Sequence, residues 1–199
     1  GTNPEDYYAR LNQTIAFSQD TNQFQSTAPT STQFFLGNDY DTNENGQTYV
    51  AYLFADNNDD GGFGPSGDKD IIKCGYYTGQ GNSNVSVNLG FEPQWLLIKG
   101  GANNNWPMFD TMRGVTTGTS NDFYLLADDS AAEVAANRLE INATGFTVNQ
   151  NHDDVNGNSG SYVYIAIRKG SLNVPEDATK VFKTVVPTVN KNDASADIP

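Results

Sequence analysis

Two runs of alternating Asp and Asn are the residues best suited to chemistry. The runs Asp41–Gly46 and Asp56–Gly61 match the opening of a calcium-binding loop, in which oxygen atoms at alternate positions wrap a hard cation. The bidentate Glu of such a loop is missing, because the twelfth positions hold Tyr52 and Gly67. Turns rich in Asp and Asn have the same composition for purely conformational reasons, so an ordinary turn is the alternative interpretation of both runs.

The second run is the better calcium candidate, because further carboxylates lie close to it. The predicted ligands are Asp56, Asn58, Asp60 and Asp68. Carboxylates crowded in this way destabilise one another unless a cation or water separates them. Calcium is therefore the one cofactor that the sequence suggests.

A polar loop around one tryptophan suggests a different site. Trp106 follows Asn104 and Asn105, and an aromatic ring flanked by amides has the composition of a shallow glycan-binding site. A lone loop Trp also serves as a partly buried anchor whose indole N–H bonds to a neighbour. The sequence leaves both interpretations open. The other tryptophan, Trp95, lies in an apolar run and is expected in the core.

Catalysis finds little support in the sequence. His152 is the only histidine, and it lies in a polar run, without a Gly-x-Ser-x-Gly motif to supply a nucleophile. Cys74 is the only cysteine, which excludes an internal disulfide and a thiolate metal site. The glycine-rich loop before Asp68 has this carboxylate where a phosphate-binding loop has Lys. We expect no enzyme and no catalytic residue, with a carboxylate pair in a glycan-cleaving cleft as the open alternative.

The charge balance excludes other classes of partner. The chain of 199 residues has 24 acidic and 11 basic side chains, which gives a formal net charge of −13. Nucleic-acid binding needs clustered Lys and Arg, so we expect no nucleic-acid partner. The longest apolar run, Tyr49–Ala55, is far shorter than the ~20 residues that span a membrane, so we expect no membrane insertion.

Composition predicts the fold class. The chain has 24 Asn and 19 Gly, residues that dominate turns, and it is rich in aromatic and β-branched residues that favour strands. We therefore expect an all-β fold of sandwich-like units, of jelly-roll or lectin-like type. The predicted strands are Thr32–Leu36, Thr48–Ala55, Asp70–Tyr77, Val85–Leu89, Gln94–Lys99, Phe123–Ala127, Arg138–Ile141, Gly145–Asn149, Ser161–Arg168 and Thr179–Val185, with one helical turn at Ala131–Ala136.

An internal repeat organises the chain. The pattern that begins at Asp41 returns at Asp154, with an offset of 113 residues and no gap, and it places Tyr49 on Tyr162. A duplication explains this match, so we expect the two tyrosines at equivalent places on equivalent strands. The residues that follow each tyrosine are almost continuously apolar, which is typical of a central strand covered on both faces.

The repeat predicts the domain organisation. We expect residues 1–56 to form the C-terminal half of a first β unit, residues 57–69 a linker rich in Gly and Asp, residues 70–170 a complete second unit, and residues 171–199 an extended tail leading to a further module or partner. The first unit lacks the strands that the second has between Ile71 and Lys99. A central strand without neighbours needs a partner, so we expect a homo-oligomer, a fibre or a trimer.

Several sequence blocks resemble a known family. These blocks are Gly61–Asp68, Ile72–Gly75, Val87–Lys99, Phe109–Gly114, Gly145–Val148 and Ser161–Arg168. Their order and spacing resemble a repeated β-rich domain of unknown function from structural and tail-fibre proteins of marine tailed phages, cyanophages especially. The resemblance covers roughly residues 7–185, and it implies a virion component that is built of tandem modules and has no known catalytic residues.

These observations favour a structural function. We expect a non-enzymatic module of a phage fibre, appendage or capsid-surface protein, located in the virion or outside the cell. Its partners would be further copies, other virion proteins and the host surface. The competing hypothesis is a glycan-binding domain for receptor recognition, with Asn104, Asn105 and Trp106 at its site.

Overall fold

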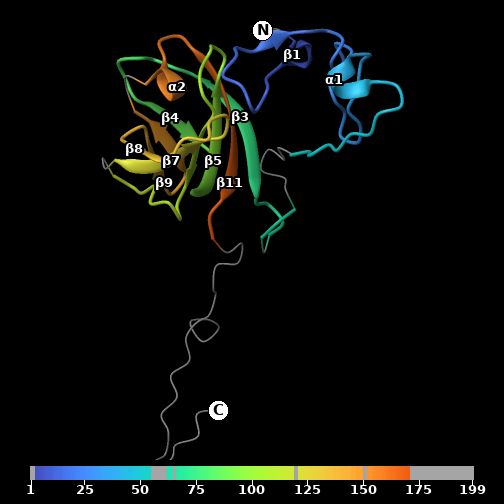
Figure 1. Cartoon of the computed structure of the whole chain (residues 1–199). Helices are drawn as coiled ribbons and strands as arrows, with labels where there is room; N and C mark the ends of the chain where they lie inside the picture. The colour runs from blue at the N-terminus through green and yellow to red at the C-terminus, as the bar shows by residue number, and fades with distance from the viewer. Residues whose placement is uncertain (1–2, 55–61, 65, 119–120, 150–151, 171–199) are drawn as a thin grey trace, which may run out of the picture.

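The fold is all-β, as the composition predicts. The computed structural model describes residues 3–54, 62–64, 66–118, 121–149 and 152–170. In these residues the only helices are single turns, namely η1 (Pro4–Asp6), α1 (Tyr40–Asn43) and α2 (Asp153–Asn156). A β-sandwich and a smaller N-terminal unit beside it make up the described chain (Figure 1).

The larger sheet of the sandwich has six antiparallel strands, in the order β3-β11-β5-β6-β7-β8. Their bounds are β3 (Ile72–Thr78), β11 (Ser161–Arg168), β5 (Pro93–Gly100), β6 (Pro107–Asp110), β7 (Asp122–Leu126) and β8 (Val134–Ala136). Strand β11 pairs with β3 on one side and with β5 on the other. The prediction that the apolar run from Tyr162 forms a central strand is therefore confirmed.

The smaller sheet has three antiparallel strands, in the order β4-β10-β9. Their bounds are β4 (Val85–Asn88), β10 (Gly145–Val148) and β9 (Leu139–Asn142). Strand β4 alternates between half-buried Val and exposed polar residues, as its sequence predicts. This sheet packs face to face on the larger one, with one core between them (Figure 1).

Aromatic residues from both sheets fill the middle of this core. Tyr77 of β3 stacks on Tyr162 of β11, with 5.1 Å between the ring centroids. Phe146 of β10 meets Tyr77 and Tyr164 edge to face, at 6.1 and 5.4 Å. The hydroxyl of Tyr77 donates to the carbonyl oxygen of Val155 at 2.7 Å, so the buried phenol is satisfied.

Three predicted elements differ in the structure. Residues 32–36 and 48–54 belong to no strand, and the predicted helical turn at Ala131–Ala136 contains β8 instead. The run 48–54 has the composition of β11, which pairs with β3 and β5. The described N-terminal unit has no equivalent of these two neighbouring strands, so the run has nothing to pair with. The six-residue run Ala131–Ala136 is too short to form a stable helix by itself, and β7 offers it a pairing edge.

The N-terminal unit is held by short elements instead. Strand β1 (Tyr7–Tyr8) pairs with β2 (Ser18–Gln19), and α1 closes the unit. The predicted linker at 57–69 and the strand at Thr179–Val185 lie wholly or partly outside the described residues. The predicted domain boundaries stay predictions; the strands of the sandwich run from Ile72 to Arg168.

The stacked tyrosines predict alkaline unfolding. Burial, and to a lesser extent the neighbouring Tyr162, raises the pKa of Tyr77 well above its ordinary value. The unfolded chain loses this proton near pH 10 while the folded chain keeps it, so the contribution of Tyr77 is complete below about pH 10 and is lost as the pH rises further. Urea midpoints measured between pH 8 and 11 should therefore fall less steeply for Tyr77→Phe than for the wild type.

The neighbouring Tyr76 supplies the control for this experiment. Its side chain is 83 % exposed, so Tyr76→Phe should keep the wild-type dependence on pH. Parallel curves for the wild type and Tyr77→Phe would contradict the expectation.

Candidate functional site

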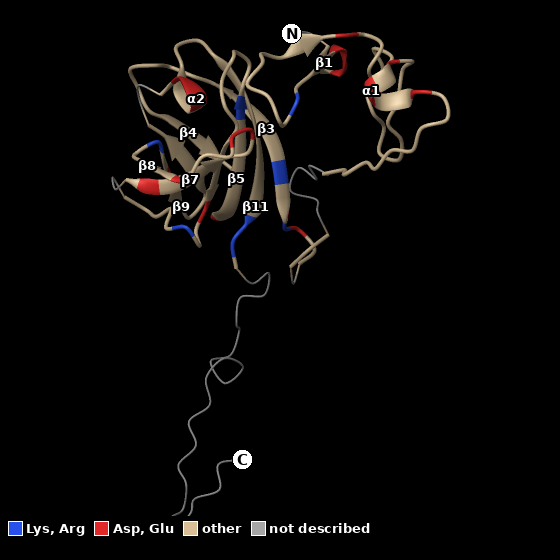
Figure 2. Cartoon of the chain, viewed as in Figure 1, with Lys and Arg blue, Asp and Glu red and all other residues tan. Residues whose placement is uncertain are grey.

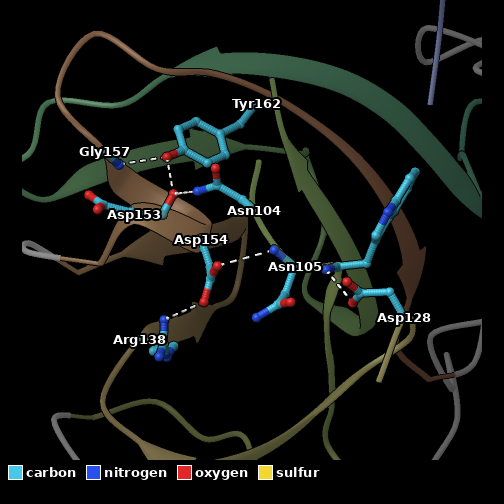
Figure 3. A network of polar contacts seen from close by, with 9 residues as sticks. Asn104, Asn105, Asp128, Arg138, Asp153, Asp154, Gly157 and Tyr162 are labelled. Carbon is cyan, nitrogen blue, oxygen red and sulfur yellow. Dashed lines mark hydrogen bonds and ion pairs between the residues drawn. The ribbon is translucent and has the colours of Figure 1, made fainter. Parts of the chain in front are cut away.

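The loops at the α2 end of the sandwich bring the predicted glycan residues together. Asn104, Asn105 and Trp106 lie in the loop from β5 to β6. Asn104 and Asn105 lie beside α2 (Figure 3). Asn104 is buried, and the other two are half-buried. The predicted cluster therefore exists as a spatial group, and its contacts decide what it can do.

The two asparagines join the loop to α2. Asn104 donates from its side-chain amide to the carbonyl oxygen of Asp153. The backbone N–H of Asn105 donates to Oδ1 of Asp154 at 3.2 Å, and Oδ2 of the same carboxylate pairs with Arg138 at 3.1 Å (Figure 3). These side chains thus connect the loop, α2 and the start of β9.

Trp106 is an anchor in this structure. Its indole N–H lies 3.1 Å from the carbonyl oxygens of both Arg10 and Gln13, in the N-terminal unit. Its backbone N–H donates to Oδ1 of Asp128 at 2.9 Å. The side chain therefore ties the N-terminal unit to the sandwich instead of standing open as a plate for a sugar ring. Glycan binding by Asn104, Asn105 and Trp106 stays a prediction.

Lys99 is a second link between the two units, and no pattern in the sequence indicates it. The residue is fully buried, and Nζ donates to the carbonyl oxygens of Thr14 at 3.1 Å, Ala102 at 3.4 Å and Asn104 at 2.5 Å. Its ammonium group also lies 5.6 Å from the ring centroid of Trp106. Burial lowers the pKa of Lys99, while the charge of Asp128 opposes this shift. The residues around Lys99 in the sequence do not indicate that it is buried, because a solvated Lys at the end of a strand would have the same neighbours.

Asn156, at the end of α2, is the most completely satisfied polar side chain of the site. It has no exposed surface. Its Oδ1 accepts from the backbone N–H of Gln80 at 2.7 Å, and Nδ2 donates to the carbonyl oxygens of Ser83 at 2.8 Å and Asn149 at 3.1 Å. One buried amide therefore holds three chain segments together, as a buried polar group requires.

A shallow polar hollow opens beside α2. Its lining is Gly81, Asn82, Arg138, His152, Asp153, Asp154, Asn156 and Asn158. Asn82, Asp153 and Asn158 are exposed there. Burial, and then the charge of Arg138, lowers the pKa of His152, which favours its neutral form. Amide, carboxylate and imidazole groups in one hollow suit a ligand rich in hydroxyl groups, although no Trp, Tyr or Phe is among its described lining residues.

The predicted calcium ligands are not assembled in the described residues. Asp56, Asn58 and Asp60 lie outside them, and Asp68 is exposed and pairs with Lys69 at 2.8 Å. No group of three or more His, Cys, Asp or Glu residues that could hold a metal occurs in the described part of the chain. The calcium site around Asp56 stays a prediction.

The first Asp/Asn run forms a helical turn. Asp39 caps α1 by accepting from the backbone N–H of Asp41, and the carboxylate of Asp41 pairs with Arg10. Asn43 uses its side-chain amide to donate to the carbonyl oxygen of Gly37 at 2.7 Å. The ordinary-turn interpretation therefore accounts for these residues.

The internal repeat appears in the structure as two helical turns, α1 and α2, whose tyrosines make the same hydrogen bonds. In the N-terminal unit the hydroxyl of Tyr49 accepts from the backbone N–H of Glu44 and donates to the carbonyl oxygen of Tyr40, both at 2.8 Å. The hydroxyl of Tyr162 accepts from the backbone N–H of Gly157 at 2.6 Å and donates to the carbonyl oxygen of Asp153 (Figure 3). Each of these atoms matches its counterpart at the sequence offset of 113 residues.

Backbone conformation supports the same equivalence. Gly46 and Ser159, which share that offset, both adopt positive φ, at 82° and 56°. Asn43 and Asn156 each end their helical turn and each donate from the side chain to an upstream carbonyl oxygen. The two segments diverge after the tyrosine, where β11 begins in the sandwich and no strand forms in the N-terminal unit. The predicted equivalence is therefore correct for the turn and wrong for the strand.

Fold and site together define a β-sandwich domain whose loops are joined to an N-terminal unit through a buried Lys and a Trp. The chain belongs to the family described as "Domain of unknown function (DUF7483)", whose profile matches residues 2–169. The matched range includes the N-terminal unit as well as the sandwich. No curated protein and no solved structure matches the chain. None of the helices in the described residues has the length and apolar character needed to cross a membrane.

The duplicated turn supplies a matched pair of mutations. Tyr162 is only 2 % exposed, so Tyr162→Phe removes both hydrogen bonds of a buried hydroxyl and should lower the free energy of unfolding by about 1–3 kcal/mol. Tyr49→Phe removes the equivalent bonds at a site that is 46 % exposed, where water replaces them, and should cost less than about 1 kcal/mol. Denaturant titration measures both changes, and equal losses would contradict this account.

Proposed function

We propose that the chain is a non-enzymatic structural module of a phage virion, in a fibre, appendage or capsid-surface protein. The sequence blocks quoted above support the virion location by resemblance. In this proposal the protein acts by assembling, and its partners are further copies and other virion proteins. Homo-oligomeric assembly as a fibre or trimer is part of the proposal.

One structural observation carries the proposal: the apolar run 49–54 of the N-terminal unit lies in solvent. Val50 is 80 % exposed, Tyr52 82 % and Leu53 73 %. A contiguous run of large apolar side chains on a surface marks an interaction site, because burying it removes apolar area from water. Its sequence equivalent, β11, is the central strand of a sheet, so the run has the composition of a segment that becomes covered.

The polar groups of the candidate site support a structural function in a second way. Asn104, Asn156 and Tyr162 are each used to bond one chain segment to another. Side chains that are committed to holding loops in place are poor candidates for proton transfer or nucleophilic attack. We therefore propose no catalytic residue.

The virion proposal predicts where the protein is found. Mass spectrometry of purified particles of the phage that carries this sequence should detect peptides of the chain in the intact-particle fraction. The peptides should stay with the particles through gradient centrifugation, as expected for a bound component. Detection in the lysate but not in the particles would contradict the proposal.

Glycan binding is the second candidate, and the hollow beside α2 favours it. Asn82, Asp153 and Asn158 present polar groups on an open surface. If this hollow binds host polysaccharide, a glycan array should give specific signals that Asn82→Ala/Asn158→Ala removes. Because Trp106 is an anchor here, Trp106→Phe should retain the signals. An array without signals for the wild-type chain would contradict glycan binding and leave the assembly proposal unaffected.

A further inference from the structure

The six-stranded sheet has an apolar outer face, turned away from the smaller sheet. In antiparallel sheets, paired residues lie on the same face, and successive residues alternate. Cys74, Ile165, Leu97, Met108 and Leu125 pair in one continuous row across five strands. The neighbouring rows of this sheet face the core, where Leu96 and Ile98 are buried. The row from Cys74 to Leu125 therefore points outward.

This outer face is only partly covered in the described structure. All five residues of the row are half-buried, although each lies on a strand that is paired within the sheet. The N-terminal unit covers one end of the face, where Thr14 and Gln13 meet Lys99 and Trp106. Beyond that end the face also carries Val163 of β11, which is 41 % exposed. A sheet face of this composition normally packs against another layer.

The described residues thus leave two apolar surfaces at least partly uncovered, and the two differ in shape. One is the outer face of the larger sheet, and the other is the run 49–54. They do not cover each other within one chain, because the side chains of 50, 52 and 53 are mostly exposed. In Figure 1 the run passes from the N-terminal unit toward β3 outside the sandwich.

We propose that the run 49–54 of one copy packs on the outer face of the larger sheet of a second copy. This inference rests on the proposed assembly function and names its interface. The contact joins two different surfaces, so it is heterologous, and repeating it produces a fibre or a closed ring. Burial of Tyr52 and Leu53 against Leu97 and Ile165 supplies the driving force.

Charge favours a second copy at this particular face. Residues 11–68 contain eight acidic residues and neither Lys nor Arg, so the part of the N-terminal unit that follows Arg10 is strongly acidic (Figure 2). An acidic unit is repelled by most of a chain whose net charge is −13. The row from Cys74 to Leu125 carries no charged side chain. Of the two rows beside it on the same face, one carries Lys99, which is fully buried, and the other carries Asp110, whose charge is paired with Arg113 at 2.8 Å. The outer face is therefore a surface that the acidic unit can approach with little repulsion.

The only cysteine of the chain lies in this row, which provides the test. The full-length double variant Leu53→Cys/Cys74→Ser carries one thiol on the run, and the wild-type chain carries one thiol on the outer face. Mixed and oxidised with diamide, the two should form a disulfide-linked dimer that contains one copy of each, seen on a non-reducing gel and verified by mass spectrometry. The matched control is Met112→Cys/Cys74→Ser, because Met112 is 94 % exposed and lies outside both surfaces.

The proposal predicts several-fold more mixed dimer with the thiol at 53 than with the thiol at 112. Leu53→Asp should lower the mean mass seen by light scattering, whereas Met112→Asp should not. Equal yields at both positions would overturn the proposal. So would a single variant Leu53→Cys that forms only an intramolecular disulfide, because the run would then cover its own sheet. Both results concern the purified chain, so they are independent of whether the protein is found in virions.

Discussion

The bond between the Tyr162 hydroxyl and the α2 turn is the constraint on which the rest of the site depends. It fixes the end of the central strand β11 to the turn just before it. Asn156 ends the same turn and bonds to two other segments, the loop from β3 to β4 and the end of β10. Asp153 accepts from Asn104 in the loop from β5. One short turn therefore bonds to the loop from β3, the loop from β5 and the end of β10. Replacing Asn156 or Tyr162 would leave buried polar groups unsatisfied.

The second constraint is how the N-terminal unit is attached. No apolar core joins it to the sandwich among the buried residues; instead Lys99 donates to carbonyl oxygens of both units, and Trp106 donates to two carbonyl oxygens of the N-terminal one. Hydrogen bonds from a buried ammonium group are strong because the local dielectric constant is low, and for the same reason losing one partner is costly. The attachment is thus directional, and it explains how a unit with so few buried apolar residues keeps a defined place.

The sequence predicts most strands of the sandwich, but neither β6 nor β8, and it does not predict the contacts of the site. Alternation and apolar runs predict β4, β5, β10 and β11, because the apolar residues within each of these strands show which of its faces are buried. Strand β8 forms because β7 offers it a pairing edge, and the run 48–54 forms no strand because it has no neighbouring strands. Both outcomes depend on other segments, so the local composition predicts neither. The residue types of the loop 104–106 indicate a site, but its distant partners, Asp153, Asp154, Gln13 and Arg10, lie 49 to 96 residues away along the chain. Lys99 and Asn156 have no local signal at all.

The duplicated turn separates what a segment encodes alone from what its neighbours supply. Both copies form the same helical turn, the same tyrosine bonds and the same positive φ, and all of these contacts lie within ten residues of one another. The strand that follows forms only in the copy flanked by β3 and β5. The apolar residues after Tyr49 therefore have the composition of a buried strand but lack neighbouring strands. Exposed apolar side chains of this kind favour binding to another apolar surface, because binding removes them from water.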